Sequence, residues 1–372
     1  MKKFQVIINI IFFSVLLFFL VNFSLGIIWE LRTNIKFKNF KPYDDIVLKA
    51  LKLNEEEGLK LYLETFINRK FDYDQFTEHA ENNGYSNRFV NVTPDLGRKT
   101  KSPIECQQNI YLYGGSTMFG YNVTDEQTIA SYIGELLIKN DHKICIKNFG
   151  RGSYFSTQEN ILFQKHILRK RIKKRDIAIF LDGLNENGNR NSRNTGFLYK
   201  STQTINQKYW DMYKYTFPIF FESLSINQFI IKLQKKLNLQ KKQKYQQQNI
   251  FDLDDNLKNV FQYNILIRNG ICEKFDIYCF NFIQPFATIH GNYFKEMPEG
   301  AAENKPLQLI ENKSLKKKYL ILKKTEGTID ISNSFDKSKE LSYVDGVHYS
   351  PSANKILAGR IYSVIKGKFY GK

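Results

Sequence analysis

The amino-acid sequence predicts an α/β fold in which helices cover both faces of a mostly parallel sheet, preceded by one membrane-spanning helix. Short apolar runs with the length of strands alternate with longer segments whose apolar residues recur at helical spacing. This alternation favours parallel strands joined by helices, because each connection returns across a face of the sheet. A separate observation is a long run without charged residues near the N-terminus.

The N-terminal run extends from Phe4 to Trp29, and its 26 residues contain no charge. As a helix the run would be about 39 Å long, which exceeds the ~30 Å hydrocarbon core of a bilayer. A cleaved signal peptide would have a shorter apolar centre, and residues 22–26 make a poor cleavage site. We therefore expect an uncleaved anchor at 4–29 that contacts membrane lipid. Lys2 and Lys3 favour a cytoplasmic N-terminus, with the rest of the chain outside the cytoplasm.

Strands and helices are expected to alternate along the rest of the chain. The expected strands cover residues 110–113, 143–148, 176–181 and 277–283. The expected helices cover residues 126–139 and 157–174, and a last helix begins at Pro351. Ahead of them, residues 42–67 have the apolar spacing of a helix, whereas residues 70–100 are polar and aromatic and read as irregular.

The chain is expected to divide into three parts: the anchor at 4–29, an arm at 30–103 and one large domain at 104–372. Two segments interrupt the strand–helix pattern of this domain, at about 187–260 and 295–340, and are expected to be inserts. The Lys/Gln-rich stretch at 232–249 is of low complexity, which supports the first assignment.

The excess of positive over negative charge is concentrated in three segments of the chain. The 372 residues include 55 Lys and Arg against 37 Asp and Glu, a formal net charge of +18. Residues 165–175, 232–244 and 313–324 contain 7, 6 and 6 basic residues and no acidic ones, so the remaining chain is nearly neutral. The first segment is interpreted as a helix end, where cations suit the helix dipole. A nucleic-acid partner is not expected for a chain that begins with a membrane span.

Glycines and polar side chains follow the ends of the expected strands. Ligands of open parallel sheets bind beyond the carboxyl ends of the strands, so these positions are candidates for a site. Gly-Gly-Ser at 114–116 follows the first strand, Asn-Phe-Gly-Arg-Gly-Ser-Tyr at 148–154 the second and Asp-Gly-Leu-Asn at 182–185 the third. Asp-Gly-Val-His at 345–348 lies just before the last helix.

These four blocks contain the residue types that acyl transfer needs. Ser116 lies at a strand-to-helix turn, where its hydroxyl can be exposed as a nucleophile. Glycines in the second block let backbone N–H groups approach a ligand closely. Asn185 can donate a hydrogen bond to a developing oxyanion, and His348 can take the serine proton while Asp345 orients its ring. Each block alone is a common turn or cap, and only their order favours a site.

That order of Ser, Gly, Asn and Asp-His resembles the SGNH/GDSL family of serine esterases and acyl hydrolases, in its membrane-anchored bacterial form. The resemblance covers residues 108–187 and 343–365, and residues 71–98 resemble the arm of anchored members. It implies a flavodoxin-like, three-layer α/β/α fold. One departure is that the usual Gly-Asp-Ser reads Gly-Gly-Ser at 114–116, although the missing Asp is not a triad member.

The resemblance also implies a triad of Ser116, His348 and Asp345 that works without a cofactor. The oxyanion donors would be the backbone N–H groups of Ser116 and Gly152 and the amide of Asn185. A one-residue shift of the alignment would put Ser153 in place of Gly152. We expect no metal site, because no His-x₃-His or Cys-x₂-Cys spacing occurs.

The four cysteines are Cys106, Cys145, Cys272 and Cys279. A location outside the cytoplasm would permit a disulfide bond between Cys272 and Cys279. Cys145 lies in an expected strand and is interpreted as a small core residue.

Together these observations predict a membrane-anchored serine esterase that removes an O-acyl or O-acetyl group. The substrate is expected to be an acylated small molecule or polysaccharide, a carbohydrate or another cell-envelope compound, an expectation that rests on location and resemblance alone. Two alternatives stay open: an O-acyltransferase that uses the same triad, and a catalytically silent envelope scaffold, which the altered Gly-Asp-Ser block and the inserts would suit.

Overall fold

The computed structural model describes residues 2–38, 40–69, 71–81, 84–103, 105–186, 252–287, 289–290 and 313–369. Most of the first expected insert, with the Lys/Gln-rich stretch at 232–249, and the start of the second lie outside the described residues. The chain forms two units, one that contains the N-terminal helix and one that contains the α/β domain, and each is described by itself.

Helix α1 (Lys2–Lys38) contains the expected span. Its segment Phe4–Ile28 is long and apolar enough, by length and composition, to cross a membrane, and among the described residues no other helix has this property. The helix runs beyond the apolar segment, so its end does not mark the end of the span.

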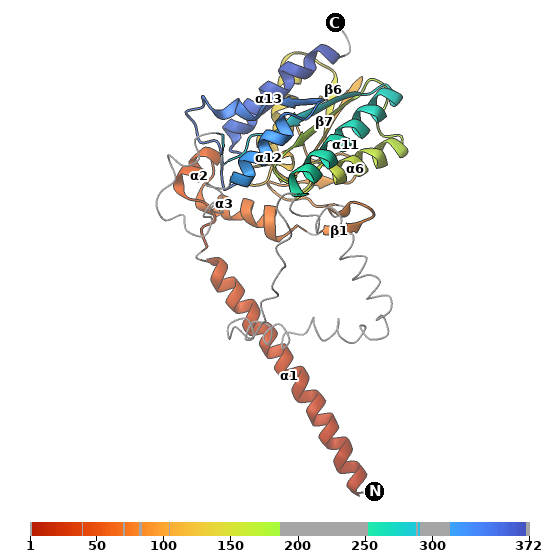
Figure 1. The fold of residues 1–372 in the computed structure, drawn as a ribbon. Coiled ribbons are helices and arrows are strands. Elements are labelled where there is room, and N and C mark those ends of the chain that lie inside the picture. The colour runs from red at the N-terminus through yellow and green to blue at the C-terminus, as the bar shows by residue number, and fades with distance from the viewer. Residues whose placement is uncertain are drawn as a thin grey trace. The chain divides into compact units, whose positions relative to one another are not determined.

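The α/β unit is built on a seven-stranded sheet (Figure 1). In spatial order its strands are β3 (Val92–Thr93), β4 (Gly97–Arg98), β6 (Ile144–Asn148), β5 (Gln108–Gly114), β7 (Ile177–Asp182), β8 (Tyr278–Ile283) and β9 (Thr328–Asp330). Neighbouring strands are parallel except β3 and β4. Numbered along the chain, the strands from β6 to β9 have the order 2-1-3-4-5, which is the flavodoxin-like order. The predicted flavodoxin-like sheet is therefore confirmed.

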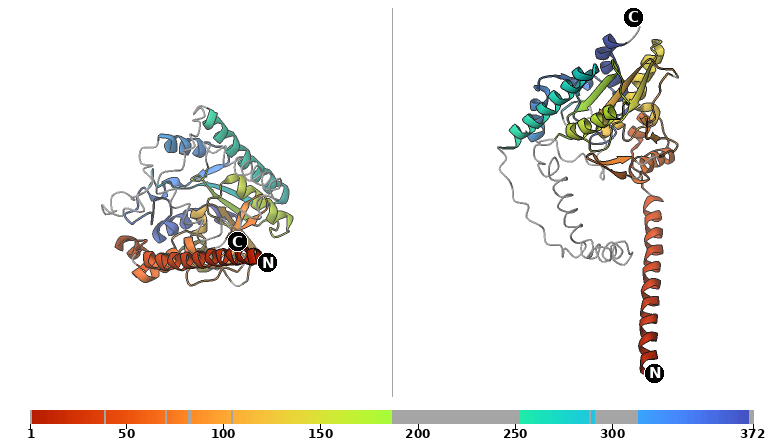
Figure 2. Two further views of the ribbon diagram at one scale, coloured as in Figure 1. Left: turned by 90° about the horizontal axis from the view of Figure 1, so that it is seen from below. Right: turned by 90° about the vertical axis from the view of Figure 1, so that its right-hand side faces the viewer.

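Two layers of helices cover this sheet. They are formed by α5 (Ile129–Lys139), α13 (Pro351–Ile365), α6 (Ser156–Leu168) and α11 (Asp252–Phe275). α5 and α13 pack with Ile110 and Leu112 of β5 on one face, whereas α6 and α11 pack with Tyr111 and Tyr113 on the other. Figure 2 shows α6 and α11 side by side. Successive residues of a strand point to opposite faces, so the apolar run of β5 serves both cores and the three-layer prediction is confirmed.

The arm is more ordered than the sequence suggests. Its elements are α2 (Asp45–Leu51), α3 (Glu55–Tyr62), a π-helical turn (Leu63–Ile67), and a hairpin of β1 (Phe71–Asp74) and β2 (Glu78–Glu81). The expected single helix at 42–67 is interrupted because Lys52 adopts a left-handed conformation, with φ 59°, and ends α2. Asn54 then starts α3 with a capping box to Glu57. Strands β3 and β4 of the expected irregular stretch extend the main sheet.

The structure also differs from the sequence analysis in the second expected insert. Residues 313–340 contain α12 (Lys313–Lys323) and strand β9, which pairs in parallel with β8 so that Ile329 lies opposite Phe282. A strand of three residues is too short to show a periodicity of two, so the sequence pattern could not reveal it. Short helices complete the unit: α4 (Ser116–Phe119) and 3₁₀ turns at Asp125–Gln127, Ser332–Phe335 and Lys366–Lys368.

All four cysteines form disulfide bonds. Cys272 pairs with Cys279, as the sequence analysis anticipated, with 6.0 Å between the Cα atoms. Cys106 pairs with Cys145 over a Cα–Cα distance of 5.4 Å, so the interpretation of Cys145 as a free core residue is wrong. The reason is the register of β5 and β6, which puts Cys145 opposite Asn109 and close to the segment that enters β5. No alternation along either strand indicates such a cross-strand partner.

Candidate active site

Three predicted site residues meet at the carboxyl ends of β5 and β7. Ser116 is the first residue of α4, which follows β5 after the extended residue Gly115. Asn185 follows β7, and His348 precedes α13, whose N-cap is Ser350. Because the carboxyl ends of parallel strands lie at one edge of a sheet, loops that are far apart in sequence come together there.

Ser116, His348 and Asp345 form one chain of hydrogen bonds. Ser116 Oγ lies 2.9 Å from His348 Nε2, and His348 Nδ1 lies 2.7 Å from Asp345 Oδ2. A carboxylate only accepts hydrogen bonds, so Nδ1 carries the proton of a neutral His348 ring and Nε2 is left to accept from the serine hydroxyl. Asp345 Oδ1 also accepts from the backbone N–H groups of Val347 (2.8 Å) and His348 (2.7 Å).

The surroundings of Asp345 favour its ionised form. Burial by itself would raise the pKa of this carboxyl. The charge of a protonated His348 and the hydrogen bonds from His348 and Val347 outweigh that effect, and the pKa lies below its ordinary value of 3.8. Asp345 is thus a carboxylate at neutral pH, as an acceptor for the His348 ring must be.

Asn185 lies beside the nucleophile helix. A Cβ atom built on Gly115 would come within 2.3 Å of Asn185 Nδ2 and 3.2 Å of the Tyr154 carbonyl oxygen. Asn185 Nδ2 donates one hydrogen bond to this carbonyl, at 2.7 Å, and has a second proton to donate. A side chain at position 115 would therefore require the Asn185 amide to shift.

The turn of residues 151–154 contains both candidates for the backbone oxyanion donor. The Tyr154 N–H donates to the Arg151 carbonyl at 3.3 Å, which leaves Gly152 and Ser153 as the central residues of the turn. Ser153 has a φ of 64°, a conformation that ordinarily favours glycine. Both residues therefore stay candidates for the backbone donor. Within the described residues, neither the Gly152 nor the Ser153 N–H has a hydrogen-bond partner, and the same holds for the Ser116 N–H.

His79 of β2 contacts this turn, and the sequence analysis did not identify it. Its Nε2 lies 3.0 Å from the Gly152 carbonyl oxygen, and its own carbonyl accepts from the Tyr154 hydroxyl at 2.6 Å. Arg151 Nη1 forms an ion pair with Asp74 at 3.1 Å. The hairpin of the arm thus contacts the turn at three of its residues, Arg151, Gly152 and Tyr154. A lone histidine in an irregular stretch offers no sequence signal for such a contact.

Aromatic side chains pack around the His348 ring. The Tyr121 ring stacks on it, with 5.1 Å between centroids and 20° between planes, and the Phe66 ring meets its edge at 6.5 Å. Phe66 belongs to the arm and is 38% exposed. Tyr121 therefore covers one face of the His348 ring, and the ring of Phe66 beside it is partly exposed.

A buried ionic network joins the Asn185 loop to α6. Arg268 of α11 donates to both carboxylate oxygens of Asp182, at 2.5 and 3.1 Å. Glu186 accepts from the Ser156 N–H at 2.5 Å and from the Ser156 hydroxyl at 2.9 Å. Burial and the Asp182 charge raise the pKa of Glu186 to about 7. Arg268 also donates to the Ser156 carbonyl oxygen at 3.2 Å, so the residues on either side of Asn185 are both connected to the start of α6, which follows the 151–154 turn.

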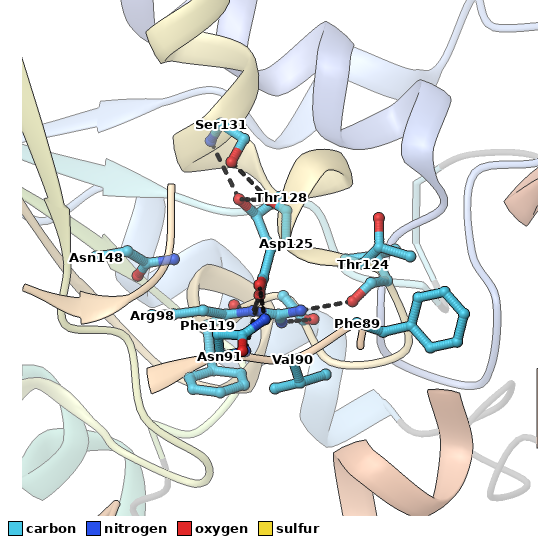
Figure 3. A network of polar contacts seen from close by, with 12 residues as sticks. Phe89, Val90, Asn91, Arg98, Phe119, Thr124, Asp125, Thr128, Ser131 and Asn148 are labelled. Atoms are coloured by element: carbon cyan, nitrogen blue, oxygen red, sulfur yellow. Dashed lines mark hydrogen bonds and ion pairs between the residues drawn. The ribbon is translucent and has the colours of Figure 1, made fainter. Parts of the chain in front are cut away.

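A second network supports the loop that follows α4, and Figure 3 shows it. Buried Arg98 of β4 donates to Asp125 Oδ1 at 3.0 Å and to the carbonyl oxygens of Phe119 (2.9 Å) and Val123 (2.6 Å). Asn91 Nδ2 donates to the other oxygen of Asp125 at 2.7 Å. A strand of the arm therefore closes the loop 119–125 around one guanidinium, whose fork of donors suits several acceptors at once.

The remaining histidines lie apart from this site. The His166 ring accepts or donates a hydrogen bond at Tyr113, His142 packs on Phe369 and His290 packs on Tyr319. In the part of the chain that the structure describes, no group of three His, Cys, Asp or Glu side chains is arranged to bind a metal.

The sequence matches no family model and no curated protein. The solved structures that match this chain include lipolytic enzymes and acetyl xylan esterases. One is a lipase/acylhydrolase from Enterococcus faecalis, at 11% identity and a TM-score of 0.40, with 72% of this chain and 99% of that chain covered.

A second match is a member of the lipolytic protein G-D-S-L family from Veillonella parvula, at 10% identity and a TM-score of 0.35, over 70% of this chain and 98% of the other. A third is an acetyl xylan esterase from Geobacillus stearothermophilus, at 13% identity and a TM-score of 0.33, over 72% of this chain and 99% of the other. At this level of likeness the matches fix neither a substrate nor the role of any residue in this chain.

Proposed function

We propose that this chain is a serine ester hydrolase whose nucleophile is Ser116. The observation that carries the proposal is the continuous hydrogen-bond chain from Ser116 Oγ through His348 to Asp345, at 2.9 and 2.7 Å. Its members come from two elements that are 232 residues apart in sequence. A nucleophile, a base and an orienting carboxylate in this relation are what acyl transfer to a serine requires.

In the proposed reaction Ser116 Oγ attacks the ester carbonyl carbon while His348 Nε2 takes the hydroxyl proton. The tetrahedral intermediate carries its negative charge on the former carbonyl oxygen, where the N–H of Ser116, the N–H of Gly152 or Ser153 and the amide of Asn185 can donate. The intermediate collapses, and the leaving alcohol takes the proton from His348. Water then attacks the acyl-serine with the same base, which releases the acid and restores the hydroxyl.

The missing Asp of the Gly-Asp-Ser block does not argue against activity. No step above uses a side chain at position 115, and Gly115 is the residue that leaves room for the Asn185 amide. This removes one of the two observations that would suit a silent scaffold, the altered block; the inserts are the other.

We propose that the domain lies outside the cytoplasm and acts on an O-acyl or O-acetyl ester of a cell-envelope carbohydrate. Two disulfide bonds support the location, because such bonds persist in oxidising compartments and are rare in the cytosol. The apolar segment Phe4–Ile28 supports a membrane anchor. The choice of a carbohydrate rests on this location and on the resemblance given above.

A fluorophosphonate probe tests the nucleophile directly. The full-length chain in mild detergent should be labelled, and the Ser116→Ala variant should not. Equal labelling of both proteins, or of neither, would contradict the assignment. Acetate release from an acetylated polysaccharide, measured for the wild type and for His348→Ala, tests the base and the substrate class. Transfer of the acetyl group to an added acceptor instead of water would identify an acyltransferase.

A further inference from the structure

We propose that Asn122 and Tyr43 are positioning residues for the triad, so that the arm takes part in orienting Asp345; this rests on the proposed function. Asn122 Nδ2 donates to Asp345 Oδ2 at 2.5 Å, and the Tyr43 hydroxyl donates to Asn122 Oδ1 at 2.6 Å. The hydrogen-bond chain of the site therefore continues beyond Asp345 into the arm.

The direction of each hydrogen bond in this extension follows from chemistry. Asp345 is a carboxylate and accepts only, so Asn122 must present its NH₂ group to it. The Asn122 carbonyl oxygen then points away and needs a donor, which the Tyr43 hydroxyl supplies. Burial and the nearby Asp345 charge raise the pKa of Tyr43 well above its ordinary value, so this phenol keeps its proton.

Both residues are buried, so water cannot replace their contacts. Tyr43 is 7% exposed and Asn122 is 2% exposed. Asp345 Oδ2 is the oxygen that His348 also uses, at 2.7 Å, and Asn122 fixes where this oxygen lies. Without Asn122 the carboxylate loses one of its four donors and can rotate away from the ring.

The backbone conformation at position 122 favours an asparagine. Its φ of 61° lies in the left-handed region, which Asn adopts more readily than most residues. The loop around it is fixed through Arg98, which donates to the carbonyl oxygens of Phe119 and Val123. Tyr43 reaches the loop from the segment just before α2. Tyr43 and Asn122 thus connect the arm to Asp345, which is the last member of the hydrogen-bond chain that starts at Ser116.

The test compares each variant with a matched substitution away from the site, in the full-length protein in detergent. The control for Asn122→Ala is Asn354→Ala. Asn354 is also buried, and its side-chain amide donates to the Gln127 carbonyl oxygen at 2.9 Å. The control for Tyr43→Phe is Tyr113→Phe. The Tyr113 hydroxyl is also buried and lies 2.8 Å from His166 Nδ1. kcat and KM are measured per probe-titrated site.

Asn122→Ala should lower kcat about tenfold or more with little change in KM, and Tyr43→Phe should lower it by a few-fold, while the two controls keep wild-type kcat. Equal losses in Asn122→Ala and Asn354→Ala would reduce the role to one in stability and overturn the proposal, with the proposed function intact. If Ser116→Ala keeps full activity, the proposed function and the positioning role fail together.

A different observation carries a second inference: we propose that a cavity between the arm and α6 binds a small oxyanion, a phosphate or a carboxylate. The cavity has a volume of about 390 Å³, and its charged lining residues are Asp74, Arg98, Arg151, Lys165, Arg169 and Arg171. Cavities of roughly 300–1,000 Å³ are of ligand size. Three of these cations belong to the basic segment 165–175, which the sequence analysis explained only as a helix end.

The positive charges of this cavity exceed its negative ones. Arg151 and Lys165 share the single carboxylate of Asp74, at 3.1 and 2.6 Å, and Arg171 pairs with Asp95, which is 80% exposed. Arg169 has no ion pair within the described residues.

The same excess of positive charge acts on His166, which also lines the cavity. Burial and the charges of Arg171, Arg151, Arg169 and Lys165 lower the pKa of His166 to about 3. An anion at this place would be attracted by side chains that the protein itself leaves incompletely neutralised.

Calorimetry of the full-length protein with inorganic phosphate and with glucuronate tests this site and separates the two ligand chemistries. Arg169→Gln should weaken binding about fivefold, whereas Lys170→Gln, which removes the same charge one residue further along and outside the lining, should leave it unchanged. The absence of saturable binding of either anion at millimolar concentration would overturn the proposal. Equal weakening by both variants would do the same, because it would indicate unspecific attraction to the segment.

Discussion

The α/β domain and the arm contribute different parts of the candidate site. The domain supplies the groups that would react: Ser116, Asn185, Asp345 and His348 all lie in loops at the carboxyl edge of its sheet. The arm supplies none of these groups. Its Phe66 packs on His348, whereas Tyr43 and His79 contact the neighbouring loops, at Asn122 and at Gly152. Reacting groups are thus set by the sheet topology, whereas their orientation depends on a segment outside it. Five variants test that division.

Asp345→Asn should lower kcat by about 10⁴-fold, because a neutral amide cannot stabilise the imidazolium and can present the wrong tautomer to Ser116. Steady-state hydrolysis of a small acetyl ester measures the effect. Asn keeps the shape of Asp but turns an NH₂ group toward two of the four donors that the carboxylate accepts, so the variant should also unfold at a lower temperature. kcat is therefore compared at a temperature at which both proteins are folded. A loss of less than tenfold would remove Asp345 from the triad.

Asn185→Ala should lower kcat by about 10²–10³-fold with KM nearly unchanged, as for other oxyanion donors. The reason is that its amide would bind the transition state more strongly than the substrate. A rise in KM at constant kcat would instead show that Asn185 binds the ground state.

Gly115→Ala should lower kcat by about tenfold, because the new Cβ would lie 2.3 Å from Asn185 Nδ2 and displace the amide. Gly270→Ala is the matched control, since nothing lies within 4 Å of a Cβ at that position. The prediction fails if both variants keep wild-type kcat. Such a result would also leave the Gly-Gly-Ser block without a structural explanation.

His79→Ala tests the arm's contact with the oxyanion turn and should lower kcat by about three- to tenfold. The loss arises because the Gly152 carbonyl loses its partner and the turn gains freedom. His142→Ala, whose ring packs on Phe369 away from the turn, should have no effect on kcat. A comparable loss in both would separate His79 from the site.

Asp74→Asn should act mainly on stability, and its effect should be the smallest. Burial raises the pKa of Asp74, but hydrogen bonds from Lys165, Thr77 and Arg151 and the Arg151 charge outweigh it and lower the pKa from 3.8 to about 2. A lowered folded-state pKa stabilises the fold above the unfolded value, and that contribution is lost as pH falls from about 4 to about 2.

The wild type should therefore be more stable than Asp74→Asn by about 1–2 kcal/mol at pH 7, with the difference vanishing toward pH 2. Denaturant unfolding at both pH values measures it. A difference that persists at pH 2 would mean that Asp74 acts through packing and not through its charge.

The parallel strands at the centre of the sheet and the order of the four blocks were predictable from sequence because both are local signals. β5 and β7 are apolar runs bounded by glycine or acidic residues, and Ser116 and Asn185 follow them directly. Since parallel strands bring their carboxyl ends to one edge, such residues can be expected to meet without knowledge of the register.

Other parts of the site had no local signal. Two-residue strands such as β3 and β4 show no periodicity, so the position of Arg98 under the 119–125 loop could not be anticipated. The pairing of Cys106 with Cys145 depends on a parallel register that neither segment encodes alone. The same holds for His79, which is separated from Gly152 by 73 residues.

The sequence by itself indicated which residues are candidates for the chemistry: a serine after glycines, an amide after a buried strand, and an Asp-x-x-His before a helix. Only the tertiary structure decided which residues orient them, because that depends on distances between segments that share no pattern. Tyr43 and Asn122 are 79 residues apart, and Asn122 and Asp345 are 223 apart. Reactive groups are recognisable from residue type and local turn geometry, whereas a hydrogen bond exists only once packing has brought its donor and acceptor within about 3 Å.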